Sequence, residues 1–352
     1  MHKKDFFFKN YFSNSKKLKK NLEKTKKIFN NFKLNLKKNK IPLLKSYEKN
    51  YQFNFSKSTI NKFLKYNNII IIGMGGSILG AKSIYSFLNK KIKKKVFFLD
   101  NLDPNIISNY KKIKNLKNSC FIVVSKSGNT LETITNLGLI FSEKLLKNKL
   151  VIIAEKKDNA LLDIAYRYQA KIIEHKESIV GRYSVLSETG MFPAALMGLK
   201  LVKFKNLKQL IKNESFVSCL IKNVASIHTL NLKKINNSII LNYDSSLNNL
   251  GYWYQQLVGE SLGKGGKGIN PVLSSGPKDH HSLLQLYLDG PKDKFFTFFN
   301  SSKKENKYKV SKKIMLGKMS FLKNMNLEDI INNQSNATKN IFKLKKIPFR
   351  EI

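Results

Sequence analysis

The chain has 352 residues, a formal net charge of +42 and 42% hydrophobic residues, enough to bury the cores of two domains. No apolar run reaches the roughly 18 residues of a membrane span, and the run Phe6–Phe8 is too short for a signal peptide. Cys120 and Cys219 lie far apart in the sequence, in apolar or helical stretches, which predicts that both are reduced thiols. We therefore expect a cytoplasmic protein that is not bound to a membrane.

The positive charge raises nucleic acid as a partner, but only Arg167, Arg182 and Arg350 are arginine, the residue that nucleic-acid sites favour. The lysines are spread along the chain among many asparagines and isoleucines, which indicates a compositional bias. We expect no specific nucleic-acid partner. The positive field would still attract an anionic substrate, at a rate that falls with salt.

Residues 1–50 form a basic N-terminal arm, rich in lysine and asparagine. Apolar residues recur at helical spacing from Ile28 to Leu36 and predict a short amphipathic helix that ends before Pro42. We expect this arm to pack on the first domain rather than to form a core of its own. A basic tail that binds nucleic acid is the alternative.

Residues 51–200 alternate apolar, β-branched runs with stretches of helical length, such as Leu131–Leu146 and Leu161–Tyr168. This alternation is typical of an α/β fold, in which helices cover both faces of a parallel, doubly wound sheet. We expect the first domain to end near residue 200. Its strands are predicted at Ile69–Ile72, Lys95–Leu99, Cys120–Val124, Leu150–Ala154 and Ala170–Ile173.

Two of these strands end in turns of the kind that bind phosphate. Gly73–Ser77 (GMGGS) follows the first strand, and Ser125–Thr130 (SKSGNT) follows the third. Each turn precedes a predicted helix, so that backbone N–H groups and a helix N-terminus would point at an anion. Two such turns on neighbouring strands favour one small phosphorylated ligand.

A dinucleotide site is the rival interpretation of the first turn. Asp100 follows the next strand, where an acid that binds a ribose would stand. Ile78, however, occupies the position at which the dinucleotide fingerprint needs Gly or Ala, and such a fold has no use for Lys126 and its neighbours. The turns therefore favour a phosphosugar over a nucleotide.

Residues 201–352 predict a second domain of the same class, without an internal sequence repeat. After Pro193 the chain is expected to be helical to about Leu232. A second α/β unit is then predicted, with strands at Ser238–Tyr243 and Phe295–Phe298 and helices at Leu247–Val258 and Ser282–Leu288.

Five segments resemble the glucose-6-phosphate isomerase family, in the family's order and over about residues 60–350. They are the two turns, Gly181–Ser187 (GRYSVLS), Gln256–Lys264 (QLVGESLGK) and Asp279–Pro291 (DHHSLLQLYLDGP). The resemblance implies two doubly wound, mainly parallel sugar-isomerase (SIS-type) domains and a homodimer that needs no cofactor. It also implies the interconversion of glucose 6-phosphate and fructose 6-phosphate through an enediol, in glycolysis and gluconeogenesis.

This reaction moves a proton between adjacent carbons and develops charge on an enediol oxygen. Glu260 is the expected base, one helical turn after Gln256. An arginine at position 182 of so lysine-rich a chain suggests a role that lysine cannot fill, and the resemblance implies that Arg182 stabilises the enediolate. By resemblance, His281 assists ring opening and comes from the neighbouring subunit. Substrate and phosphate binding is expected at Gly76, Ser77, Ser125, Lys126, Ser127, Thr130, Gly181 and Gln256.

The segments depart from the family's pattern at three positions. Val180 stands where a second glycine usually precedes the arginine, Ser127 replaces a threonine, and His280 replaces a common glutamine. No His/Cys/Asp cluster has metal-ligand spacing, so we expect no metal. The family continues beyond the segment that matches Asn333–Ile352, with a region that carries a ring-opening lysine. We therefore expect a truncated version of a longer protein and assign that lysine's role to no residue here.

A non-catalytic regulatory protein that binds sugar phosphates with the same domain fold is the alternative function. Such a protein needs the two phosphate turns but has no use for Glu260, Arg182 and His281 together. Their joint presence favours the enzyme.

Overall fold

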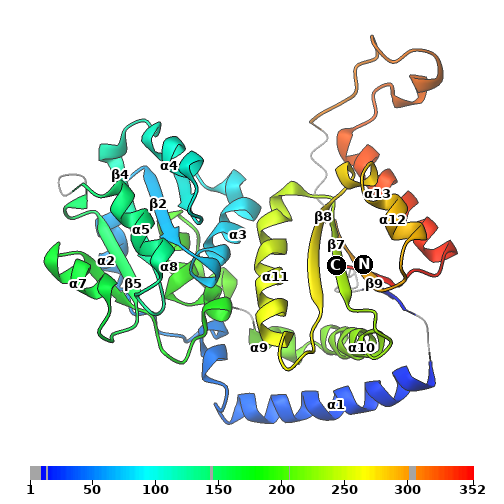
Figure 1. Cartoon of the computed structure of the whole chain (residues 1–352), viewed down its shortest axis with the longest axis horizontal. Coiled ribbons are helices and arrows are strands. Elements are labelled where there is room, and N and C mark those ends of the chain that lie inside the picture. The colour runs from blue at the N-terminus through cyan, green and yellow to red at the C-terminus, as the bar shows by residue number, and fades with distance from the viewer. Residues whose placement is uncertain (1–8, 13–14, 143–145, 206, 301–306) are drawn as a thin grey trace. The chain divides into compact units, whose positions relative to one another are not determined.

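The computed structural model describes residues 9–12, 15–142, 146–205, 207–300 and 307–352. It divides into two compact units (Figure 1). The first unit contains Asn31–Lys212 and Tyr252–Leu257, and the second unit contains the residues up to Asn30, Asn213–Gly251 and Val258–Ile352. This division differs from the continuous ranges 1–50, 51–200 and 201–352 that the sequence predicts. The N-terminal arm is shared between the units, and so is one helix, α11 (Asn248–Leu262).

A sheet of five parallel strands, in the order β3-β2-β4-β5-β6, forms the centre of the first unit. Every predicted strand of the first domain is confirmed to within one residue at each end. The strands are β2 (Asn68–Gly73), β3 (Lys95–Leu99), β4 (Ser119–Val124), β5 (Leu150–Ala154) and β6 (Lys171–Glu174).

Helices cover both faces of this sheet, which explains the unbroken apolar runs (Figure 1). Ile69 and Ile71 of β2 pack toward α2, α3 and α8, whereas Ile70 and Ile72 pack toward α4, α5 and α7, and all four are fully buried. The helices are α2 (Lys57–Leu64), α3 (Leu79–Leu88), α4 (Pro104–Lys111), α5 (Leu131–Ile140), α7 (Ala160–Arg167), α8 (Glu188–Leu196) and α9 (Leu207–Lys212).

The strand order places both predicted phosphate turns together. From β2 the chain passes to β3 on one side and later to β4 on the other, so the order reverses between β2 and β4. Ligands of doubly wound sheets bind at the carboxyl ends of the strands at such a reversal. Gly73, the last residue of β2, pairs with Val124, the last residue of β4, so the two turns start side by side.

The second unit repeats this strand order. Its sheet has the order β1-β10-β9-β7-β8, in which β8-β7-β9-β10 corresponds to β3-β2-β4-β5 of the first unit. All pairs are parallel except β1 with β10. The two units therefore share a topology that no sequence repeat reveals. The strands are β1 (Lys9–Tyr11), β7 (Asn237–Asn242), β8 (Asn270–Ser275), β9 (Lys294–Phe299) and β10 (Phe349–Glu351).

The helices α12 and α13 cover one face of this second sheet (Figure 1). Aromatic residues fill the core on this face. Phe296 and Phe298 of β9 meet Phe342 of α13 and Phe349 of β10, with ring centroids 4.6–6.1 Å apart. On the other face, Gly251 of α11 lies against Leu273 of β8. The helices of this unit are α10 (Glu214–Asn231), α12 (Leu284–Asp289) and α13 (Leu327–Leu344), together with parts of α11 and of α1 (Lys16–Lys37).

The expectation that the N-terminal arm packs on the first domain is wrong for residues 9–30. β1 pairs with β10 of the second sheet, and the Tyr11 ring stacks on Phe349 at 4.4 Å. The buried Asn21 amide of α1 donates to the Thr229 hydroxyl at 2.8 Å. β10 would otherwise be an edge strand with unpaired backbone groups, and β1 pairs them.

Two further differences concern secondary structure. The helix expected from Pro193 to Leu232 is interrupted, because α8 ends at Leu196 and Gly198 follows with φ +83°, a conformation that favours glycine. Strand β8 is not among the predicted strands, and it contains Pro271, a residue that is rare within strands. β8 lies at the edge of its sheet, where a missing N–H is tolerated. None of the described helices is long and apolar enough to cross a membrane.

Candidate functional site

The first turn leaves β2 as a short 3-10 helix, Gly75–Ser77, which leads into α3. Gly75 has φ +51°, and a side chain there would meet the Gln256 amide nitrogen at 2.8 Å. Gly76 lies against the backbone of Gly181, where an added Cβ would be 2.3 Å from the carbonyl carbon. Both positions therefore require glycine, for backbone conformation at Gly75 and for close approach at Gly76.

The 3-10 helix Gly181–Leu186 carries Arg182 and is fastened to this first turn. The buried Ser184 hydroxyl lies 3.1 Å from the Gly76 carbonyl oxygen and 2.7 Å from that of Gly181, and it donates toward both. The Trp253 indole N–H donates to the Arg182 carbonyl at 3.0 Å. The structure thus joins the first turn, the Arg182 segment and the middle of α11.

The departure at Val180 does not prevent this close approach. A Cβ on Gly181 would meet nothing within 4 Å, whereas a Cβ on Gly76 would overlap the Gly181 backbone. A side chain is therefore excluded at Gly76 but not at Gly181. The Arg182 guanidinium lies 5.2 Å from the Tyr183 ring centroid, a cation–π contact.

The second turn is held by its own hydroxyl groups. The buried Ser125 hydroxyl lies 2.8 Å from the Thr130 hydroxyl and accepts from the Gly128 N–H at 3.1 Å. Gly128 has φ +71°, and a Cβ there would overlap the Asn159 amide oxygen at 1.8 Å. Asn159 in turn caps α7 by accepting from the Leu162 N–H at 3.1 Å. The turn is therefore shaped jointly by its own sequence and by the start of α7.

Lys126 and Ser127 lie differently within this turn. The Lys126 ammonium donates to the Glu177 carbonyl at 2.9 Å and pairs with the Glu155 carboxylate at 3.3 Å. Ser127 is exposed, and its hydroxyl accepts from the Asn129 N–H at 3.3 Å. The Lys126 ammonium is thus held by residues that follow β5 and β6.

Three of the predicted site residues lie in α11 or shortly after it in the chain. Gln256 belongs to the first unit, and Glu260 and His281 belong to the second. Glu260 is exposed in the last turn of α11, which continues four residues beyond the predicted end at Val258. Gln256 and Glu260 are separated by one helical turn and share a face of α11.

The side chains of the adjacent residues His280 and His281 lie in different surroundings. His280 Nε2 lies 2.7 Å from the Tyr243 hydroxyl and 3.3 Å from the Thr338 hydroxyl. Burial, and next the neighbouring His281, lower the pKa of His280. His281 is exposed. His280 is therefore engaged in the packing of the second unit, and His281 is the histidine open to solvent.

The structure does not favour the rival interpretation, in which the Asp100 carboxylate binds the ribose of a nucleotide. Asp100 forms an ion pair with Lys82 of α3, so its carboxylate already has a structural role. Within the described part of the chain, no group of three or more His, Cys, Asp or Glu residues is arranged to hold a metal.

Sequence reasoning missed two residues that shape the site, Ser184 and Asn159. Ser184 stands inside the GRYSVLS segment, two residues after Arg182, but a serine in a turn gives no sign of which carbonyl oxygens it will reach. Asn159 precedes an apolar helix, which is an N-cap signal, but its contact with Gly128 spans 31 residues.

Comparison with known proteins identifies the family. The sequence profile of the phosphoglucose isomerase family, described as "Phosphoglucose isomerase", matches residues 56–273. A glucose-6-phosphate isomerase of Methanocaldococcus jannaschii is 38% identical, with 78% of this chain and 69% of the relative covered. A glucose-6-phosphate isomerase of Campylobacter jejuni is 32% identical, with 77% and 70% covered.

Solved structures show the same fold. A hypothetical protein of Thermus thermophilus superposes with a TM-score of 0.73 and 24% identity, covering 84% of this chain and 75% of the other. A glucose-6-phosphate isomerase of Chlamydia trachomatis superposes with a TM-score of 0.68 and 18% identity, covering 84% and 62%. The profile match spans more than half of the chain and includes the two turns, the Arg182 segment and Glu260. The chain belongs to the phosphoglucose isomerase family.

Proposed function

We propose that this protein interconverts glucose 6-phosphate and fructose 6-phosphate, as an aldose–ketose isomerase of glycolysis and gluconeogenesis. The observation that carries the proposal is the pairing of Gly73 with Val124, which starts both phosphate turns at one reversal of the strand order. The names of the relatives support the same reaction.

In this proposal the second turn binds the phosphate. The hydroxyls of Ser125, Ser127 and Thr130, the charge of Lys126 and the first N–H groups of α5 supply the donors that a dianion needs. Gly76, Ser77 and Gly181 lie beside the sugar. Gln256 closes the first turn from α11 through its contact with Gly75.

The chemistry falls to three charged or titratable groups. Glu260 takes the proton from one carbon and returns it to the neighbouring carbon, because a carboxylate can act as base and then as acid. Arg182 stabilises the enediolate oxygen with its planar fork of donors. His281 assists ring opening by moving a proton at the ring oxygen.

Replacement of the base tests the reaction. Glu260→Gln keeps the shape of the side chain and should lower kcat by about 10²–10⁴-fold in a coupled assay of fructose 6-phosphate formation. Glu23→Gln, an exposed carboxylate of α1 paired with Lys26, is the matched control and should keep the parent's rate. A Glu260→Gln enzyme within about twofold of the parent would contradict the assignment.

We also propose that the protein acts as a homodimer to which each chain contributes His281. The segment Lys307–Asn326, which leads into the start of α13, supports this (Figure 1, orange). Its base is closed by the bridge between Lys309 and Asn326, and Ile314, Leu316 and Phe321 are 71%, 72% and 65% exposed. An apolar loop this exposed favours burial against another chain.

Mixing two inactive variants tests the shared site. Glu260→Gln and His281→Ala chains, unfolded together and refolded, should recover about a quarter of the parent's activity, because half of the dimers are mixed and each mixed dimer has one complete site. No recovery would show that both residues act within one chain. Refolding each variant alone is the control.

The cysteines support a cytoplasmic location. Neither forms a disulfide, and burial raises the pKa of Cys120 in β4 to about 12. A thiol held in its protonated form within a strand suits a reducing compartment.

A further inference from the structure

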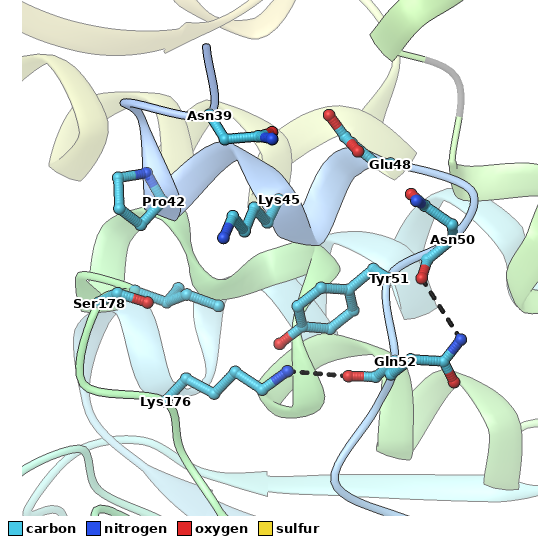
Figure 2. A pocket seen from close by; sticks show the side chains of 10 residues that line it. Asn39, Pro42, Lys45, Glu48, Asn50, Tyr51, Gln52, Lys176 and Ser178 are labelled. Carbon is cyan, nitrogen blue, oxygen red and sulfur yellow. Dashed lines mark hydrogen bonds between the residues drawn. The ribbon is translucent and has the colours of Figure 1, made fainter. Parts of the chain in front are cut away.

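A pocket of about 480 Å³ lies within the first unit, away from the two phosphate turns (Figure 2). One wall is the 3-10 helix η1 (Pro42–Tyr47) and the residues after it, and the other is the segment Lys176–Ile179, which follows β6. Small-molecule sites commonly measure roughly 300–1,000 Å³. The volume therefore suits a compact organic ligand.

Two ammonium groups reach into this pocket from its opposite walls. Lys45 comes from η1 and extends toward the side of Pro42 and Ser178, whereas Lys176 comes from the opposite segment and extends past Tyr51 (Figure 2). The Lys176 ammonium donates to the Gln52 carbonyl at 2.8 Å and lies 4.0 Å from the Tyr51 ring centroid. Within the described residues neither ammonium pairs with a carboxylate, so both keep donors for a ligand.

Tyr51, which lines the pocket, is held in place by buried charged residues. The Tyr51 hydroxyl lies 2.9 Å and 3.0 Å from the two oxygens of Glu188, which also accepts from the Asn54 N–H at 3.0 Å. The buried Lys205 ammonium donates to the carbonyls of Ser46 and Leu186 and lies 4.8 Å from the Tyr51 ring centroid.

The charge of this region favours an anion. Glu188 and Lys205 are buried, carry opposite charges and do not line the pocket. The lining itself carries the ammonium groups of Lys45 and Lys176 and one carboxylate, Glu48. A positive excess in a partly enclosed space raises the local concentration of small anions.

The remaining lining groups suit a hydroxylated or carboxylated ligand. The amides of Asn39, Asn50 and Gln52 and the hydroxyl of Ser178 can both donate and accept hydrogen bonds. The pocket thus combines two cations for an oxyanion with neutral polar groups for the rest of the molecule.

The walls of the pocket contact the proposed phosphate machinery. Glu177, between Lys176 and Ser178, accepts from the Lys126 ammonium through its carbonyl at 2.9 Å. On the other wall, the Tyr47 hydroxyl donates to the Tyr183 carbonyl at 3.4 Å, next to Arg182. A ligand that holds Lys176 in place would therefore act on the second turn through one peptide group.

We propose that this pocket is an effector site for a small organic molecule that carries an oxyanion, either a phosphate or a carboxylate. The binding itself does not depend on the proposed reaction. Its consequence for Lys126 rests on the proposed function of the second turn.

Thermal-shift titration with pyrophosphate, citrate and glycerol at constant ionic strength tests the binding. The titrations use a Ser125→Ala/Thr130→Ala background, in which the second turn is impaired. The charged probes should raise the apparent Tm and glycerol should not, and the better charged probe distinguishes phosphate from carboxylate. Lys45→Gln with Lys176→Gln in the same background should weaken binding by at least about tenfold.

A control variant, Lys49→Gln, and a single variant, Lys45→Gln, complete the test. Lys49→Gln removes an exposed lysine outside the lining and should keep the affinity of the background. Lys45→Gln alone also tests the site, because the Lys45 ammonium makes no hydrogen bond or ion pair within the described residues. An unchanged Tm shift in the double lysine variant, or the absence of any shift with charged probes, would overturn the proposal.

Discussion

Glycine positions show how single residues shape the two turns. Gly76 allows the first turn to touch the Arg182 segment, and Gly128 allows the second turn to touch the cap of α7. In both cases a methyl group would overlap atoms far away in the sequence. The glycines thus serve the packing between segments as well as the turn conformation.

Gly128→Ala tests this at the second turn. The substitution places a side chain at φ +71° and displaces Asn159, so we expect a loss of about 2–3 kcal/mol from backbone strain and the weakened cap. Urea unfolding monitored by circular dichroism measures the loss. Gly138→Ala in α5 is the control, because a Cβ there meets nothing within 4 Å and should stabilise the helix slightly.

Lys205 predicts a pH dependence of stability. Burial is the largest cause that lowers the pKa of Lys205 from 10.5 to about 8. Between these values the unfolded chain holds a proton that the folded chain has lost, so this group raises the free energy of unfolding as pH rises from about 8 to 10.5. The gain is at most roughly 3 kcal/mol.

Comparison with Lys205→Met isolates that contribution. The stability of the parent relative to the variant should increase as pH rises through this window, measured by urea unfolding at each pH. Lys203→Met removes an exposed charge nearby and is the control. A constant difference between parent and Lys205→Met would argue against a lowered pKa.

At the scale of elements, the edges of the second sheet differ from those of the first. β8 tolerates Pro271 because it is an edge strand, and β10 gains its outer partner from the N-terminal strand β1. The equivalent position in the first sheet is filled by β6, which follows β5 in the chain. The same topology is thus completed by two different segments.

Tyr11→Ala tests the contribution of β1. The variant loses the stacking of Tyr11 on Phe349 and the contact of Lys343 with the Tyr11 ring at 4.7 Å. We expect faster amide hydrogen exchange in β10 and β9, with the first unit unchanged. Tyr166→Ala, at a 70% exposed position in α7, is the control and should alter neither sheet. Unchanged exchange in β10 would show that β1 contributes little.

At the scale of the whole molecule, the charge of +42 calls for a partner or a compositional explanation. Lysine supplies nearly all of it, and the few arginines have defined places: buried Arg350 donates to Thr297 and Asn223 at 2.9 Å, and Arg182 lies in the candidate site. Lysines that project singly into solvent bind phosphates without reading bases.

The charge therefore predicts weak binding to duplex DNA of any sequence. Affinity should fall steeply between about 50 and 200 mM salt, because the binding releases counterions. Fluorescence anisotropy with two unrelated duplexes measures this. A complex that persists at physiological salt and prefers one sequence would refute the compositional explanation.

The sequence by itself determined the strands of the first unit, the place of both phosphate turns and the family to which the chain belongs. These depend on local patterns: a strand buried on both faces must be apolar throughout, and a phosphate turn needs small residues between a strand and a helix. The three residues proposed for the chemistry, Glu260, Arg182 and His281, also came from local segments.

Only the tertiary structure decided which segments meet. It joined β1 to β10, placed Gly76 against Gly181, directed the Lys126 ammonium to Glu155 and turned His280 rather than His281 inward. Each of these contacts links residues that are far apart along the chain, at separations unrelated to the repeat of a helix or a strand. No pattern in the sequence therefore predicts them. They form because burying apolar surface and pairing backbone groups favours one arrangement of the whole chain.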